Sequence, residues 1–297
     1  MSIALLVFPD FLLVALGWLL RRRYGFTREF FAGLERLVYF VLFPALLFHS
    51  VLRTPISPST ALELLQACAL VMGAGIALCA LAGPVLRAPP IALASASQCG
   101  YRFNTYLALA LAYNLGGTAG QTIMALILGF AIPIGNFAAV YGLARQNGSN
   151  PLREVLRNPL VLSTVLGLAG NLAGLQLPGP VDVFLSRLGG AALALGILCI
   201  GASLSWQGGQ GSGRLIAWML AVKLLAMPLV ALGVAALLGL DAATRQMLLV
   251  FGTLPTASAA YVLAIRMGGD GRMVALLVSL GTLLSAATIP LWLLLAG

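Results

Sequence analysis

The sequence predicts an all-α membrane protein with ten transmembrane helices, arranged as two inverted repeats of five. Of its 297 residues, 61% are hydrophobic and 8% are charged, and the mean hydropathy is +1.02. Soluble domains carry about 25% charged residues, so this composition indicates an integral membrane protein. A membrane-spanning helix takes about 20 residues, so the length allows roughly ten spans and little extramembrane structure.

Apolar runs separated by turn residues and charges define the candidate spans. They lie at 3–20, 33–52, 61–86, 90–113, 119–144, 155–174, 182–205, 214–238, 243–266 and 272–296. No basic residue precedes the first span, and Arg21, Arg22 and Arg23 follow it. This order is the reverse of a cleaved signal peptide, so we expect the first span to remain in the protein.

Arginines in the predicted loops orient these spans. Alternate loops carry eleven of them, namely Arg21, Arg22, Arg23, Arg28, Arg87, Arg145, Arg153, Arg157, Arg214, Arg266 and Arg272. The other loops carry mainly Arg53 and Arg245. By the positive-inside rule, the arginine-rich loops face the cytoplasm and both termini lie outside. The net charge of +9 is therefore a topology signal. Because the arginines are scattered over short loops, no nucleic-acid partner is expected.

Matching residues recur in the two halves of the chain. The matched sets are Pro9 and Gly17 with Pro159 and Gly167, Pro133 with Pro290, and Gly116–Gly117 with Gly268–Gly269. An odd number of spans in each half makes the halves antiparallel. The sequence therefore predicts a first five-helix repeat over residues 1–150 and a second, inverted repeat over residues 151–297.

Polar residues interrupt the fourth and ninth spans at corresponding positions. They are Gln98, Arg102, Asn104 and Thr105 in the fourth span, and Thr253, Pro255, Thr256 and Ser258 in the ninth. A polar group in hydrocarbon costs several kcal/mol unless it faces a cavity or a partner. Two interrupted spans at matching places in two halves indicate the binding site of a secondary transporter.

Several segments carry a family resemblance. Residues 102–106 (Arg-Phe-Asn-Thr-Tyr), 43–48, 158–160 and the tail from Leu254 to Pro290 resemble the auxin efflux carrier family of bacterial permeases, which includes malonate transporter-like proteins. The resemblance covers nearly the whole chain and is most specific in the tail. Many relatives carry a proline at the crossover of the fourth helix, whereas this chain has one only in the ninth, at Pro255.

The resemblance implies a fold and a mechanism. It implies ten helices in which the discontinuous fourth and ninth cross at mid-membrane, as in bile-acid sodium symporters. It also implies a scaffold of spans 1, 2, 6 and 7 beside a moving core of spans 3–5 and 8–10. The location that it implies is a bacterial inner membrane, often with the protein as a homodimer.

The predicted substrate site combines the polar residues of both breaks with two further side chains. The set is Arg102, Asn104, Thr105, Asn136, Thr253, Pro255, Thr256, Ser258 and Tyr261. A break exposes backbone N–H groups whose positive dipole end attracts an anion. Asn104 is suited to cap the second half of the fourth helix, and Thr253 that of the ninth, with Pro255 in its first turn. The site therefore predicts a small carboxylate or dicarboxylate as substrate.

Alternative roles remain open for several of these residues. Asn104 and Thr256 either form the site or only bond neighbouring helices. Arg102 either pairs with the substrate carboxylate, or caps carbonyls at the break, or extends to the interface. Tyr261 either closes the pocket or only packs. His49, the single histidine, either binds a coupling proton or is a hydrogen-bonded packing residue.

The remaining ionisable residues separate the functional classes. Cys68, Cys79, Cys99 and Cys199 lie in apolar segments without metal or redox spacing, so we expect no metal and no cofactor. Carboxylates fall near span ends, which disfavours sodium coupling because a cation site would usually need one at mid-membrane. One histidine and no mid-membrane acid leave little for enzyme chemistry. The sequence predicts alternating-access transport of an organic anion; a sodium-coupled symporter of the bile-acid type is the alternative.

Overall fold

The fold was analysed in a computed structural model that describes residues 3–53, 58–146, 157, 159–203, 213–257 and 259–296. Within those residues the chain forms helices and no strands. The all-α prediction is therefore confirmed for the described part of the chain. The predicted join near residue 150 and the site residue Ser258 lie outside the described residues.

The first half of the chain contributes six α-helices and one π-helical turn. They are α1 (Ile3–Arg23), α2 (Arg28–Leu37), the π-turn η1 (Val38–Leu42), α3 (Phe43–Arg53), α4 (Pro58–Leu86), α5 (Pro90–Tyr101) and α6 (Thr105–Gln146). The α6 element is two helices joined at Gly117, whose φ of 59° and ψ of −149° are not helical. Glycine is the residue that takes such a conformation at little cost.

The described residues of the second half also form long and interrupted helices. Its elements are α8 (Pro159–Leu172), α9 (Gly179–Ser203), α10 (Gly213–Ala221), the π-turn η2 (Val222–Ala226), α11 (Met227–Leu237), α12 (Ala242–Thr253), α13 (Ala259–Arg266) and α14 (Gly271–Ala296).

Six of the described helical segments are long and apolar enough to cross a membrane. They are Arg28–Arg53, Leu62–Leu86, Ala119–Gln146, Gly179–Cys199, Gly213–Leu237 and Gly271–Leu295. This finding supports a multi-pass membrane protein. A count of ten also needs the shorter and interrupted helices, so it stays a prediction.

Both π-turns are followed by a proline two residues later, and the proline explains them. Pro228 has no N–H to bond the carbonyl four residues earlier, and its ring would collide with that carbonyl. The widened turn η2 relieves the collision, and Met227 N donates to Val222 O five residues back. The carbonyl oxygen of Leu224, which Pro228 cannot reach, accepts a hydrogen bond from Trp292 Nε1 at 2.9 Å instead. Pro44 follows η1 in the same way.

Side-chain caps start several helices outside the apolar runs. Thr27 Oγ1 accepts from Phe30 N at 3.2 Å at the start of α2. Asp241 Oδ1 accepts from Ala243 N and Thr244 N at 2.9 and 3.1 Å at the start of α12. Hydrogen bonds from Thr244 hold the pKa of the Asp241 carboxyl below its usual range. Such caps satisfy backbone donors that a helix start leaves open.

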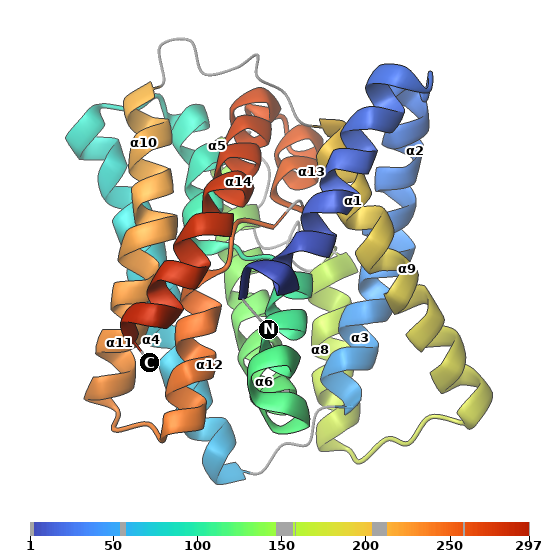
Figure 1. Ribbon diagram of the computed structural model, residues 1–297, viewed down its shortest axis with the longest axis vertical. Helices are drawn as coiled ribbons and strands as arrows, with labels where there is room; N and C mark the ends of the chain where they lie inside the picture. Colours follow the sequence, from blue (N-terminus) through green and yellow to red (C-terminus); the bar gives the residue numbers. More distant parts are fainter. Residues whose placement is uncertain are drawn as a thin grey trace.

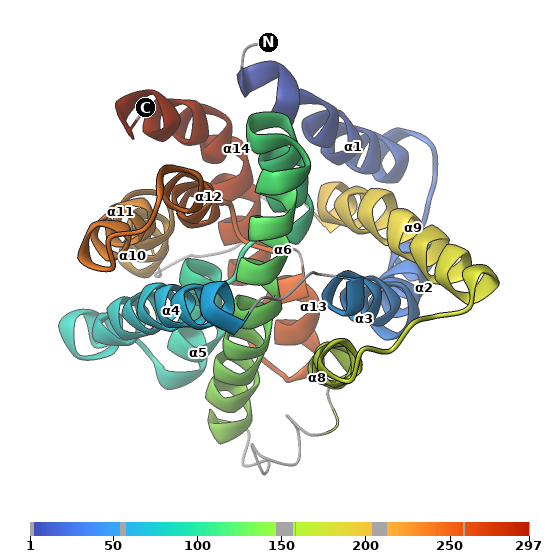
Figure 2. The same cartoon turned by 90° about the horizontal axis from the view of Figure 1, so that it is seen from below.

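The helices form two groups that meet along α6 and α13. Figure 2 shows α1, α2, α3, α8 and α9 on one side, and α4, α5, α10, α11, α12 and α14 on the other. The largest buried apolar cluster belongs mainly to the second group, whereas smaller clusters join α1, η1, α3 and α9. The first group is held by extensive packing of α1 on α9 and of α3 on α8.

Arginine-bearing helix ends gather at one end of the molecule. In Figure 1, the α1–α2, α4–α5 and α13–α14 connections lie at the upper end, whereas the α8–α9 and α11–α12 connections lie at the lower end. Arg21, Arg22 and Arg23 fall in the last turn of α1, and Arg266 in that of α13. The arrangement agrees with the alternation of loop charges read from the sequence.

Candidate functional site

The fourth and ninth predicted spans are both interrupted by extended backbone. Residues 102–104 separate α5 from α6, and residues 254–257 separate α12 from the helix that is described from Ala259 onwards. Arg102 leaves α5 at φ −74° and ψ 155°, and Leu254 leaves α12 at φ −61° and ψ 139°. Extended residues cannot continue the helical hydrogen bonds, so each break must find other partners.

The two interruptions contact each other directly. Asn104 N donates a backbone hydrogen bond to Pro255 O at 2.8 Å. Thr256 Oγ1 donates to Cys99 O, at the end of α5, at 2.6 Å. The ring of Phe103, within the first break, meets the ring of Phe251, in α12 just before the second, edge to face with centroids 4.6 Å apart. Each break thus satisfies backbone groups that the other leaves open.

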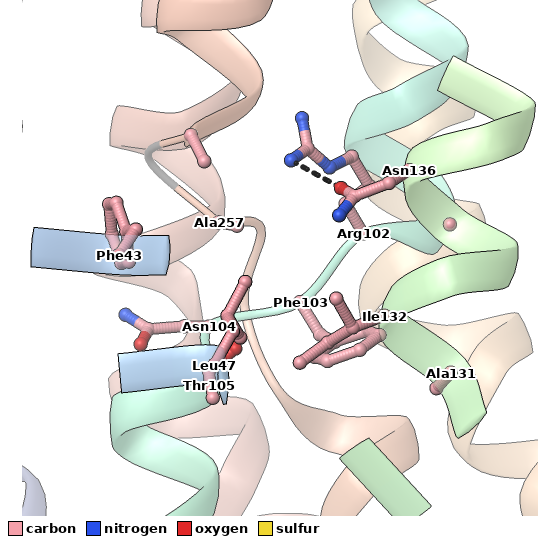
Figure 3. A pocket seen from close by; sticks show the side chains of 12 residues that line it. Phe43, Leu47, Arg102, Phe103, Asn104, Thr105, Ala131, Ile132, Asn136 and Ala257 are labelled. Atoms are coloured by element: carbon pink, nitrogen blue, oxygen red, sulfur yellow. Dashed lines mark hydrogen bonds between the residues drawn. The ribbon is translucent and has the colours of Figure 1, made fainter. Parts of the chain in front are cut away.

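Arg102 is buried at this contact and has only neutral partners among the hydrogen bonds and ion pairs of the described residues. Its side chain is 5% exposed. Nη1 donates to Gln98 Oε1 at 2.9 Å, and Nη2 donates to Asn136 Oδ1 at 3.0 Å, as Figure 3 shows for Asn136. Gln98 lies one helical turn before Arg102, so the spacing lets its amide reach the guanidinium. Two amide oxygens orient the positive charge but do not neutralise it.

Asn104 caps the helix that follows the first break. Its Oδ1 accepts from Leu107 N at 3.2 Å, and its carbonyl oxygen accepts from Ala108 N at 3.1 Å. The side chain is 7% exposed. The positive end of the α6 dipole therefore lies beside Arg102, and the two add to one another at a buried point.

A small cavity lies against these residues. Its volume is about 50 Å³, and its polar lining comes from Arg102, Asn104, Thr105 and Asn136. Phe43 and Leu47, from α3, form an apolar wall opposite (Figure 3). One water fills roughly 10–15 Å³ by this measure, so the space holds a few waters. Typical ligand sites measure about 300–1,000 Å³, so the site is nearly closed in this conformation.

The second break contributes backbone and packing rather than polar side chains to the cavity. Thr253 ends α12, and its hydroxyl donates to Val250 O at 2.8 Å within the same helix. Pro255 lies in the extended link. The predictions that Thr253 caps the second half-helix and that Pro255 occupies its first turn are therefore wrong. The helix α12 ends at Thr253, two residues before Pro255, which cannot donate into a continuing turn.

Two other predicted residues lie away from the cavity. Tyr261 lines a separate cavity of about 550 Å³ between α1 and α2 on one side and α13 and α14 on the other. Arg21, Arg28, Glu35 and Arg272 share that lining. The residue does not line the cavity at Asn104.

His49 also lies away from the cavity. It is hydrogen-bonded to a carboxylate of the neighbouring helix, with His49 Nε2 and Asp182 Oδ1 2.8 Å apart. Arg53 Nε donates to the same oxygen at 2.8 Å. His49 therefore links α3 to α9, within the first helix group.

Comparison with known proteins assigns the chain to a family. Residues 144–293, just over half of the chain, match the family model described as membrane transport protein. The chain belongs to this family. It is 26% identical over 299 residues to an "uncharacterized transporter" of Methanothermobacter thermautotrophicus, covering 94% of each protein. It is 25% identical over 296 residues to a "putative malonate transporter" of Rhizobium meliloti, covering 96% of this chain and 92% of that protein.

Membership of the membrane transport protein family confirms the resemblance drawn from the sequence segments, and it makes this protein a membrane transporter. Gln98 and Lys223 are among the buried polar residues of the transporter to which the sequence assigned no role. Gln98 was visible as a polar residue one turn before Arg102. Lys223 is the only lysine of the chain and lies in an otherwise apolar run. A lone lysine in an apolar membrane span is a sign of a functional residue, and this sign could have identified Lys223 from the sequence.

Proposed function

We propose that this transporter moves a small organic anion, a carboxylate or dicarboxylate, by alternating access. The anion would bind where the two helix breaks meet, against Arg102 and the start of α6. The observation that carries the proposal is the buried guanidinium of Arg102, which lines a cavity and is hydrogen-bonded to uncharged amides. The name of the Rhizobium relative, with its reference to malonate, supports the substrate class.

Electrostatics favour an anion at this point. A buried cation in a membrane is costly unless a counter-charge is nearby. A guanidinium carries five N–H donors, and the bonds to Gln98 and Asn136 use two of them. A carboxylate can accept two parallel hydrogen bonds from such a group. Binding would supply the counter-charge that the described residues do not, and backbone N–H groups at the start of α6 would add to it.

Transport requires the cavity to enlarge, and its walls suggest how. Phe43 and Leu47 belong to α3, in the group with α1, α8 and α9, whereas the polar lining belongs to α6 and the α5–α6 link. We propose that the first group is the scaffold and that the second group, together with α6 and α13, moves against it. The boundary would open toward one side of the membrane and then toward the other, carrying the anion site along.

The proposal includes ten helices in a five-plus-five inverted repeat. Gly17 of α1 packs so closely on α9 that an added Cβ would collide with Leu198 O. The matching Gly167 of α8 packs on α3, where a Cβ would lie 2.9 Å from Phe48 O. An inverted repeat pairs span 1 with span 6 and span 2 with span 7. Both glycines then make the same contact with the opposite half, which supports the repeat.

Replacing the cap residue tests the site. In purified Asn104→Ala, we expect malonate to lose its stabilising effect against thermal unfolding, while the protein stays folded and about 1 kcal/mol less stable. Wild-type protein at 100 times Kd should gain about 2.7 kcal/mol from the same ligand. Asn104→Ser keeps a capping oxygen and is the matched control, which should still respond to malonate. If Asn104→Ala folds and binds malonate as wild type does, the anion does not bind where the two helix breaks meet.

Replacing sodium tests the coupling alternative. The proposal expects malonate uptake into proteoliposomes to continue when choline replaces sodium. If uptake stops without sodium, the sodium-coupled symporter becomes the better description of the same fold.

A further inference from the structure

Lys223 is the one lysine of the chain and lies inside a candidate membrane span. It belongs to the π-turn η2, within the apolar segment Gly213–Leu237. Its side chain is 1% exposed, and it is among the largest fully buried side chains among the described residues. The π-turn, imposed by Pro228, adds a residue to that turn of the helix. Such turns occur frequently at functional sites.

Within the described residues, Lys223 Nζ is buried and makes no hydrogen bond. Neither of the ion pairs found there involves it, since both join Asp182 to His49 and Arg53. A lone ammonium in a dry apolar interior costs several kcal/mol at least, because it has lost its water without gaining a counter-charge.

The ionisable groups that surround Lys223 are thiols. The π-turn packs against α4, α5, α12 and α14. The two groups whose charges would act on the amine are Cys79 of α4 and Cys99 of α5. The other ionisable residues of the helices packed against η2 are Glu63, Cys68, Tyr101, Arg214, Arg245 and Arg272. Neither α12 nor α14 contains a carboxylate, so neither helix offers the amine a negative counter-charge.

Lys223 lies close to the contact between the two breaks, because its turn η2 packs on α5, the helix that leads into the first break. The thiol of Cys99 lies close enough to act on Lys223 and on Arg102. The carbonyl oxygen of Cys99 accepts the hydrogen bond from Thr256 Oγ1. Cys99 therefore lies near both the amine and the guanidinium. Charges that lie close together in a medium with little screening act on one another strongly.

We propose that Lys223 is the proton-binding site of the transport cycle, neutral in this closed conformation and protonated when the moving group admits water. The inference rests on the proposed function and adds its coupling ion. A bound anion beside Arg102 brings negative charge toward Lys223 and favours its protonation. One proton then binds the amine as the anion binds, and it leaves when the anion leaves. Proton and anion would thus move together.

Proton uptake on binding tests the proposal without any transport. Malonate is added to purified protein in weakly buffered solution containing a pH dye. We expect about one proton to be taken up for each malonate bound to wild-type protein, and none with Lys223→Met. The two thiols are tested by Cys79→Ala and Cys99→Ala, which should take up the proton as wild type does. The proposal is overturned if wild type takes up no proton, or if Lys223→Met takes up as much.

Transport supplies an independent readout. With one proton per anion, a pH gradient of one unit, alkaline inside, should drive about tenfold accumulation of malonate in proteoliposomes. Lys223→Met should show no accumulation in response to the gradient. A Lys223→Met protein that accumulates malonate as wild type does overturns the proposal.

Malonate-dependent thermal stabilisation separates the two proposals. It should persist in Lys223→Met, because Lys223 does not line the cavity, but it should be weaker, because the variant lacks the positive charge that the bound anion attracts. If malonate fails to stabilise the wild-type protein, the proposed anion site at Arg102 is wrong, whatever the role of Lys223.

Discussion

The two helix breaks occupy matching places in the chain but contribute differently to the site. The first break contributes a buried arginine and a capping asparagine, and both line the cavity. In the second break, Thr256 bonds Cys99 O and Pro255 O accepts from Asn104 N, so its polar groups serve the first break. The proposed anion site therefore takes its polar side chains from the first break, whereas the second break supports the first.

The residues that make each break explain this division. Proline stops a helix without any polar side chain, because it removes a donor and blocks a carbonyl. The second break can therefore be largely apolar. The first break has no proline, so its freed backbone must be satisfied by side chains such as Asn104. Those polar side chains are what make the first break the better place for an anion.

The largest expected effect lies in the first break. Arg102→Gln should weaken malonate binding by about 30-fold to several thousandfold, because losing a buried charge pair costs about 2–5 kcal/mol. Titration calorimetry measures the change. Arg245→Gln, an exposed arginine at the start of α12, is the matched control and should bind normally. Equal affinity in Arg102→Gln and wild type would show that the first break does not bind the anion.

An intermediate effect is expected in the second break, on stability rather than binding. Thr256→Val keeps the side-chain shape but removes the donor to Cys99 O. A buried carbonyl without its partner costs about 1–3 kcal/mol, so the thermal unfolding temperature should fall while the Kd for malonate stays within about twofold. Thr253→Val, which loses only a bond within α12, should be less destabilised. A large loss of binding in Thr256→Val would contradict the division between the breaks.

The smallest effect is expected where the segments around the two breaks touch through aromatic rings. Phe103 and Phe251 form an edge-to-face pair, worth about 0.5–1.5 kcal/mol beyond burial. A double-mutant cycle of Phe103→Leu and Phe251→Leu, measured by thermal unfolding, should return a coupling of that size. Strictly additive losses would mean that the two rings do not stabilise one another.

Sequence reasoning found both breaks because each combines polar residues or proline with a long apolar run. Gln98, Arg102 and Asn104 stand out in the fourth span, and Pro255 stands out in the ninth. The roles within the second break were harder to predict. Thr253 precedes a proline, which is typical of a cap, yet its hydroxyl bonds Val250 O. Spacing along the chain allowed Thr253 either to cap the following helix or to bond its own helix, and the packed structure has the second arrangement.

Tyr261 and Lys223 mark a different limit of the sequence. Tyr261 follows the second break by about one helical turn, so proximity along the chain favoured the same pocket. Its side chain instead lines the cavity that Arg21 and Arg28 also line. Lys223 lies far from either break in the sequence and reaches their vicinity only because η2 packs on α5. No periodicity within one helix reports a contact between two helices.

The amino-acid sequence by itself determined that the chain belongs in a membrane and where its helices are interrupted. Both follow from short-range physics, since apolar runs avoid water and a residue that cannot donate ends a helix. Only the tertiary structure decided which polar groups meet. Thr256 bonds a carbonyl 157 residues earlier, and Arg102 bonds an amide 34 residues later. Such partners are chosen by the packing of whole helices, which leaves Arg102 facing a cavity and Lys223 buried alone.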